Sequence, residues 1–139
     1  ARNRRGDCGI MALTFITLCR LVGIPAQWQS GLAVSPASVG NHDWAMFYIA
    51  PKGWMYADCS FGASMARNGE EELRRHYFGN LDTGRMVANR AFEAPFDPPM
   101  YGFRKDPYDN QTGEIEADGT GLYGTQVEPE KNVLHYEFL

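Results

Sequence analysis

The chain has 139 residues, and 13 Lys and Arg against 17 Asp and Glu give a formal net charge of −4. This length suits one domain, and contents of 44% hydrophobic and 13% aromatic residues exclude a disordered chain. The mild acidity argues against a nucleic-acid-binding protein, and no apolar run reaches the roughly 18 residues of a membrane span. No metal site is expected, because the three cysteines form no closely spaced pair of ligands.

The first predicted element is an apolar helix over residues 10–22, which begins just after Cys8. Asp7 is a good N-cap for this helix, and Gly23 is typical of the position that follows a helix. The polar residues of the helix form a single thin line: Thr14, Thr17 and Arg20. Because the rest of the circumference is apolar, we expect a central helix that is buried on most sides.

The next segments predict neighbouring antiparallel strands. Residues 26–32 alternate between apolar and polar side chains, which is typical of a half-buried strand. Residues 44–50 are apolar on both faces and predict a central strand, and residues 54–59 follow a Pro-Lys-Gly turn as its hairpin partner. Between the first two strands, residues 32–41 contain Ser, Pro and Gly and are expected to form a loop.

The second half of the chain has weaker patterns. Residues 70–78 predict a short helix with acidic residues first and basic residues later, as the helix dipole favours. Residues 86–92 and 132–139 predict two further strands. Residues 106–124 are rich in Gly and Asp and are expected to form a long loop.

Three residues combine into a pattern that can carry chemistry: Cys8, His42 and Asp58. A cysteine at a helix N-terminus is biased toward the thiolate by the helix dipole. His42 and Asp58 are 16 residues apart around the predicted hairpin turn, so we expect them to lie opposite or diagonal to each other. Asp58 can then hold one imidazole nitrogen while the other faces the thiol, which is the arrangement of a nucleophile, a base and an orienting residue.

Each of these residues also has a common structural role when it is considered alone. A cysteine near a helix start is usually structural, and an aspartate at a strand end often caps a turn or a helix. A one-residue slip in the hairpin would move one member of the His-Asp pair to the other face of the sheet. Of the remaining cysteines, Cys19 is expected to be a buried small hydrophobic residue. Cys59 is expected to point to the face opposite Asp58 and to be structural as well.

The motifs around these residues resemble the transglutaminase-like superfamily, which includes transglutaminases, peptide N-glycanases and bacterial cysteine peptidases. The resemblance lies in Gly-Asp-Cys-Gly at residues 6–9, His-Asp-Trp at residues 42–44 and Tyr-Ala-Asp at residues 56–58. It implies an α+β fold with a papain/transglutaminase-like core, in which a cysteine-bearing central helix packs on an antiparallel sheet.

By position, the resemblance makes Cys8 the nucleophile, His42 the general base and Asp58 the orienting residue. Trp44 and Trp28 are expected to contribute to a substrate pocket or to its packing. The implied reaction is attack of the thiolate on a peptide or amide carbonyl, followed by resolution of the thioester by water or by an amine. Water gives a peptidase or amidase and an amine gives cross-linking, and hydrolysis is the preferred expectation.

The expected domain spans residues 1–139, with a transglutaminase-like catalytic core at residues 1–62 and a family-specific extension at residues 63–139. Members of the superfamily usually have secondary structure before the cysteine, including a group that donates to the oxyanion. Because seven residues precede Cys8, we expect the domain to lack upstream N-terminal elements. The backbone N–H of Cys8 is then the oxyanion donor that can be named.

Two functional hypotheses follow. The first is a cysteine-dependent hydrolase or acyltransferase that acts on a peptide or protein substrate and needs no cofactor. The alternative is a non-catalytic binding or structural module that retains the fold. The sequence leaves the oligomeric state and the compartment open, with a secreted or periplasmic location in a bacterium as one expectation.

Overall fold

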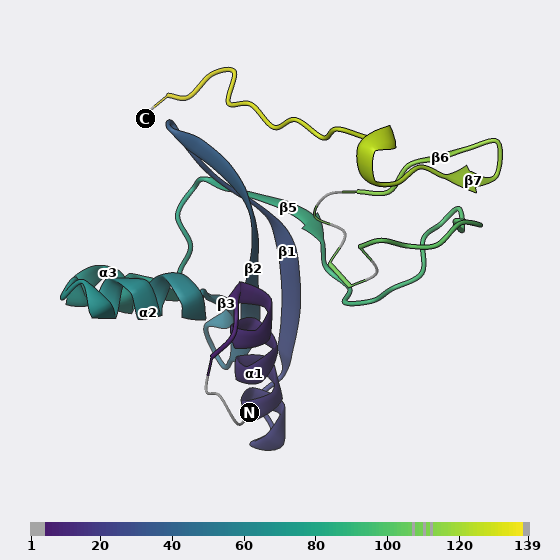
Figure 1. The fold of residues 1–139 in the computed structure, drawn as a ribbon. Coiled ribbons are helices and arrows are strands. Elements are labelled where there is room, and N and C mark those ends of the chain that lie inside the picture. Colours follow the sequence, from purple (N-terminus) through teal and green to yellow (C-terminus); the bar gives the residue numbers. More distant parts are fainter. Residues whose placement is uncertain (1–4, 107, 110, 112, 138–139) are drawn as a thin grey trace.

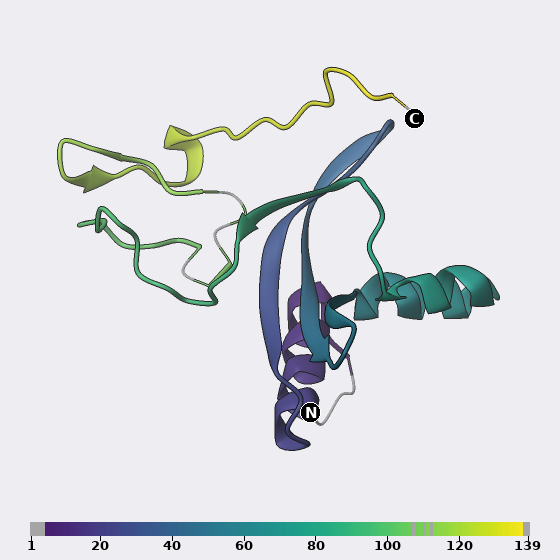
Figure 2. The same cartoon turned by 180° about the vertical axis from the view of Figure 1, so that it is seen from behind.

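The computed structural model describes residues 5–137 except 107, 110 and 112. These residues form a mixed α+β structure around a five-stranded antiparallel sheet with the strand order β4-β3-β2-β1-β5. Figure 1 shows helix α1 lying along β1 and β2, with α2 and α3 to one side and the segment from β5 to the 3₁₀ turn near residue 125 to the other, after which the chain runs back toward the tip of the β1–β2 hairpin. The view from behind in Figure 2 shows the same separation of the two sides. The expected α+β fold with a helix on an antiparallel sheet is confirmed.

Helix α1 (Cys8–Leu21) begins where the sequence predicts, because the Asp7 side chain accepts a hydrogen bond of 2.9 Å from the Ile10 N–H. One face of the helix packs on the sheet through its buried residues: Ala12, Ile16 and Cys19. The opposite face is open, with Leu18 59% exposed. The expectation of a helix buried on most sides is therefore wrong, since the sheet and α2 cover only part of its circumference among the described residues.

Strands β1 (Ala26–Ser35) and β2 (Ser38–Ile49) form a long hairpin in which Ser35 pairs with Ser38. The expectation of a loop over residues 32–41 is wrong, because the Pro and Ser signals there mark only a two-residue turn between continuing strands. Strand β2 is central, as predicted from its apolar pattern on both faces.

Strand β3 (Gly53–Ala57) is shorter than predicted, because the next residue starts a helix. Asp58 is the N-cap of α2 (Cys59–Arg67), and its side chain accepts a hydrogen bond of 2.9 Å from the Phe61 N–H. Helix α3 (Glu71–His76) falls inside the predicted helix, with acidic residues in its first turn and basic residues in its last.

Strand β5 (Arg85–Asn89) closes the β1 edge of the sheet, and two-residue β4 (Phe78–Gly79) closes the other edge. Gly31 of β1 allows β5 to approach, because a Cβ there would lie 1.9 Å from the Met86 carbonyl oxygen. The expected long loop contains a small hairpin, β6 (Glu116–Ala117) with β7 (Thr120–Gly121), followed by a 3₁₀ turn, η1 (Gly124–Gln126).

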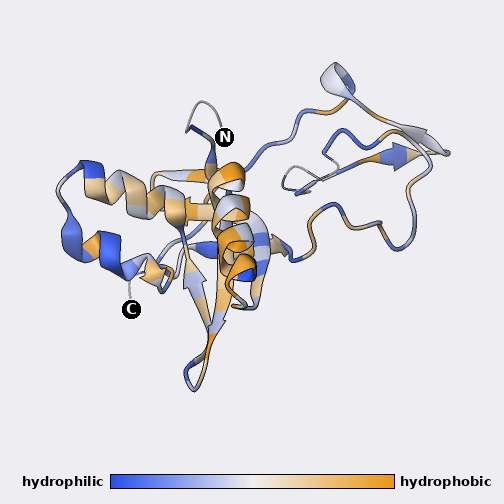
Figure 3. Cartoon of the chain, turned by 90° about the horizontal axis from the view of Figure 1, so that it is seen from below, coloured by the Kyte–Doolittle hydropathy of each residue, from blue (hydrophilic) through white to orange (hydrophobic). Residues whose placement is uncertain are grey.

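The hydrophobic core lies between α1 and the sheet, as the hydropathy colours of α1 and its neighbouring strands show in Figure 3. The strand expected over residues 132–139 is absent at 132–137, and residues 138–139 lie outside the described residues. None of the helices in the described part of the chain has the length and apolar character to cross a membrane.

Candidate active site

The histidine and aspartate expected to pair are in direct contact. His42 Nε2 lies 2.7 Å from Asp58 Oδ2, and the two residues are 6% and 1% exposed. Ala45 of β2 pairs with Ala57, the last residue of β3. Asp58 is the next residue after Ala57, so it is not directly opposite His42 and reaches it diagonally across the hairpin. Of the two arrangements expected from the spacing, the structure contains the diagonal one.

Asp58 also holds the start of α2, because its second oxygen, Oδ1, accepts from the Phe61 N–H at 2.9 Å and from Ser60 Oγ at 3.0 Å. Arg85 Nη1 lies 2.9 Å from Oδ2. Burial by itself would raise the pKa of Asp58, but His42, the Phe61 N–H and Arg85 together hold it below its ordinary value. The structure therefore favours an ionised carboxylate beside the imidazole.

Aromatic side chains enclose the imidazole of His42. The Phe61 ring lies 4.5 Å from it between centroids, and the Trp44 ring stacks at 6.2 Å. Trp44 is 0% exposed, and its Nε1 donates to Gln29 Oε1 at 2.7 Å. Trp44 thus packs against the candidate base in this structure, and its contact with a substrate stays a prediction.

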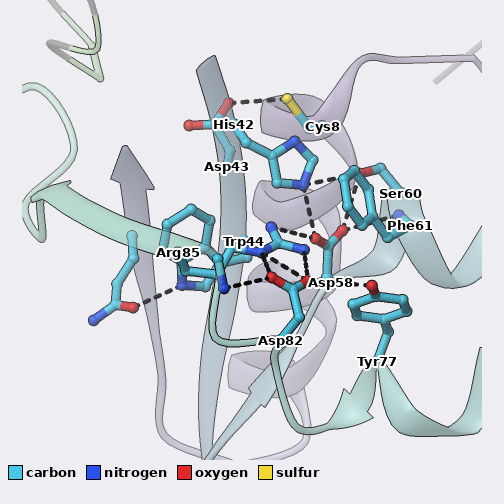
Figure 4. Close-up of polar contacts among 12 residues, drawn as sticks. Cys8, His42, Asp43, Trp44, Asp58, Ser60, Phe61, Tyr77, Asp82 and Arg85 are labelled. Carbon is cyan, nitrogen blue, oxygen red and sulfur yellow. Dashed lines mark hydrogen bonds and ion pairs between the residues drawn. The ribbon is translucent and has the colours of Figure 1, made fainter. Parts of the chain in front are cut away.

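Cys8 lies at the N-terminus of α1 and contacts the neighbour of His42 in the chain. Its Sγ donates to Asp43 Oδ2 at 3.4 Å, while Asp43 Oδ1 accepts from Gln111 Nε2 at 2.9 Å. In the view of Figure 4 the imidazole of His42 lies between the sulfur of Cys8 and the carboxylate of Asp58. Among the described residues the structure records no hydrogen bond between Cys8 and His42, so the complete triad stays a prediction.

The surroundings of Cys8 oppose the thiolate that its position at a helix start predicts. Burial raises the pKa of the Cys8 thiol to about 11, and the charge of Asp43 adds to the effect. The backbone N–H groups of Asp43 and Gly9 act in the other direction and are outweighed. The expectation of a depressed thiol pKa is therefore wrong for this arrangement, because burial and a carboxylate at 3.4 Å exceed the effect of the helix terminus.

An open cleft of about 480 Å³ is lined in part by Gln111, the residue that donates to Asp43. Acidic side chains from the segment after β5 line it, among them Asp106, Asp109 and Glu114. Burial and the neighbouring Asp106 raise the pKa of Asp109 to about 7. The segment after β5 is therefore connected to Cys8 through Gln111, which shares Asp43 as a hydrogen-bond partner with the thiol.

The other expected residues occupy structural positions. Cys19 is 8% exposed in the core, and all three cysteines are free thiols. Trp28 is 5% exposed and packs edge-to-face on Phe92 at 5.4 Å, so its role in substrate binding stays a prediction. Among the described residues, no group of three or more His, Cys, Asp or Glu side chains is arranged to hold a metal ion.

Sequence reasoning missed two charged neighbours of the site, Asp43 and Arg85. Asp43 stands inside the His-Asp-Trp motif, and its position beside the candidate base was the one available signal. Arg85 is a single arginine at the start of a short strand, and no pattern in its surroundings connects it with Asp58, which lies 27 residues earlier in the chain.

The fold and the site define a class of protein: an α+β domain with a buried His-Asp pair in a hairpin and a cysteine at the start of the packed helix. The family model described as the transglutaminase-like superfamily matches residues 1–59. This match bears out the resemblance seen in the sequence, and the matched segment includes Cys8, His42 and Asp58. None of the curated proteins and none of the solved structures compared with the chain matches it.

Proposed function

We propose that this chain is a cysteine-dependent hydrolase or acyltransferase that acts on a peptide or amide carbonyl. The transglutaminase-like superfamily suggests cysteine-dependent catalysis in general. The observation that carries the proposal is the buried contact of 2.7 Å between His42 and Asp58, because it leaves the other ring nitrogen, Nδ1, to exchange a proton with a nucleophile. Cys8 is the candidate nucleophile, at the start of the helix that packs on the same hairpin.

In the first half of the reaction, the Cys8 thiol gives its proton to Nδ1 of His42, and the sulfur attacks the carbonyl carbon. The backbone N–H of Cys8 donates to the oxyanion of the tetrahedral intermediate. The imidazolium then returns the proton to the leaving nitrogen, the C–N bond breaks, and a thioester with Cys8 remains.

In the second half, water or an amine attacks the thioester. His42 takes a proton from the attacking group and returns it to the sulfur as the C–S bond breaks, so the thiol is restored. Asp58 stays ionised and stabilises the imidazolium in both halves. Hydrolysis is the preferred outcome, and an amine acceptor would give cross-linking instead.

The Asp43 contact describes the resting state in this mechanism. The thiol is neutral while it donates to Asp43, with the pKa of Cys8 raised to about 11. Attack requires Sγ to exchange Asp43 for His42 Nδ1 as its partner, and a substrate carbonyl bound beside Cys8 would favour that exchange by excluding water. The same observation also favours the second candidate function, a binding module whose thiol never reacts.

The deciding experiment offers the protein a mixture of unmodified peptides as acyl donors together with a fluorescent primary alkylamine. Mass spectrometry then reports cleaved peptides, deamidated glutamines or amine-labelled peptides, and it locates acyl groups on the protein. We expect a thioester on Cys8 and products in the wild type, and neither in Cys8→Ala or His42→Ala. If no cysteine is acylated and no peptide changes, the binding module is the better description.

A further inference from the structure

Arg85 has an unusual place in the fold for a charged residue. It is the first residue of β5, which pairs with β1, whereas Asp58 follows β3 on the far side of β2. Its side chain crosses this distance and is only 4% exposed. A buried guanidinium loses its hydration, so it is retained only where other groups replace the water.

The guanidinium meets Asp58 at the same oxygen that holds the imidazole. Arg85 Nη1 lies 2.9 Å from Asp58 Oδ2, and His42 Nε2 lies 2.7 Å from that atom (Figure 4). The contact between Nη1 and the carboxylate is a buried ion pair. The cation and the imidazole therefore compete for one negative oxygen.

A second set of contacts fixes Arg85 independently of Asp58. Its Nε and Nη2 donate to Asp82 Oδ2 at 3.1 and 2.9 Å, and Tyr77 donates its hydroxyl to the same oxygen at 3.1 Å. The Phe61 ring lies under the guanidinium at 4.5 Å. The arginine is thus anchored by Asp82 and by aromatic rings, and Asp58 is not its sole partner.

We propose that Arg85 is a positioning residue that holds the Asp58 carboxylate against His42 and limits how tightly this pair retains a proton. Its catalytic consequence rests on the proposed function. Arg85 lies outside the residues 1–59 that match the superfamily, so a segment beyond that core supplies a charge of the site. A carboxylate alone stabilises an imidazolium, and a fixed cation on the same oxygen weakens this stabilisation. A base that must both take and return a proton works best when neither form is strongly favoured.

The test is an NMR titration of the His42 imidazole in the full chain, with ¹³C-labelled histidine and His42→Gln for assignment. Arg85→Met removes the cation, and we expect the titration midpoint to rise by about one pH unit. Turnover should fall about tenfold to a hundredfold in kcat with a smaller change in KM, and Arg85→Lys should recover part of both effects. Arg75→Met, at an arginine with a 75% exposed side chain, removes the same charge as a control and should change neither.

A second variant, expected to shift the His42 midpoint in the opposite direction, keeps the test decisive if Arg85→Met does not fold. Asp82→Asn removes the other carboxylate partner, whose side chain is 38% exposed, and leaves the cation free to act on Asp58. The midpoint should then fall. An unchanged midpoint in folded Arg85→Met, or in Asp82→Asn, overturns the assignment. The titration needs no reaction at Cys8, so it tests Arg85 separately from the proposed function. If the midpoints shift as expected but Cys8 is never acylated, the proposed function is contradicted and the role of Arg85 is not.

Discussion

The described residues before and after position 60 build the candidate site in different ways. Residues 5–59 contain α1 and the strands β1, β2 and β3, and they provide Cys8, His42 and Asp58. The described residues of 60–137 contain β5, three two-residue strands and long irregular segments, yet they supply Arg85, which contacts Asp58. The first region places its side chains by backbone pairing, whereas the second adds charges by reaching across the sheet.

This difference implies that the reacting groups and the groups that tune them can be perturbed separately. Substitution of a reacting group should abolish catalysis in a folded protein. Disturbing the attachment of the second region should change stability and proton affinity first. The variants that follow test this separation, from the largest expected effect to the smallest.

The largest effect is expected from Cys8→Ala, which removes the proposed nucleophile in the first region. Product formation from the peptide mixture should fall by at least about 10⁴-fold, as for the loss of the nucleophile in other covalent enzymes. Mass spectrometry of the peptides measures this loss. Cys19→Ala is the control at a core cysteine away from the site, and equal loss in both variants would remove the special role of Cys8.

Asp58→Asn should lower kcat by about 10³- to 10⁴-fold, because an amide cannot stabilise the imidazolium and can hold the wrong tautomer. The pKa of Asp58 is lowered in the folded state, so the ionised carboxylate stabilises the fold. This stabilisation is complete above the ordinary pKa of about 4 and is lost as the pH falls through the pKa of the folded state. Denaturation followed from pH 7 to pH 2 should show a smaller loss in the variant. Asp118→Asn, in the exposed turn between β6 and β7, is the control. If Asp58→Asn loses as much stability between pH 7 and pH 2 as the wild type does, the assignment is contradicted.

Gly31→Ala tests the attachment of the second region. The new Cβ would meet the Met86 carbonyl oxygen at 1.9 Å, so β5 must shift away from β1. We expect a loss of about 2–3 kcal/mol in the free energy of unfolding, measured by denaturant titration. Gly40→Ala adds the same group to β2 where nothing lies within 4 Å. Similar stability of the two variants would show that β5 does not depend on this close approach.

The smallest effect is expected from Asp43→Asn, which removes the charge beside Cys8. Burial remains the main cause of the raised thiol pKa, so the pKa should fall by no more than about one unit and iodoacetamide labelling of Cys8 at pH 8 should rise by up to about tenfold. Cys59 is an internal control, because its thiol pKa is also raised to about 11, by burial and by Asp58. A slower reaction of Cys8 in the variant would contradict the resting state described for this thiol.

Local patterns in the sequence were sufficient for the elements that depend on local contacts. The cap at Asp7 set the start of α1, and the apolar pattern of residues 44–50 identified the central strand. The errors arose where neighbours in space decide. The Ser, Pro and Gly signals of residues 32–41 predicted a loop, but pairing along β1 continues the strands to a short turn. The open face of α1 depends on which elements cover it, and its own pattern carries no such information.

The sequence by itself determined the candidate residues of the site and predicted that two of them lie close together. Cys8 starts a capped helix, and the spacing of His42 and Asp58 around one hairpin turn brings them near each other, because a hairpin joins residues near in sequence. The structure selected the diagonal arrangement in which they are in contact. Only the tertiary structure decided the partners that set the charge of the site, Asp43 beside the thiol and Arg85 beside Asp58. These contacts depend on helix packing and on the strand order β3-β2-β1-β5, which join distant segments that no local pattern relates.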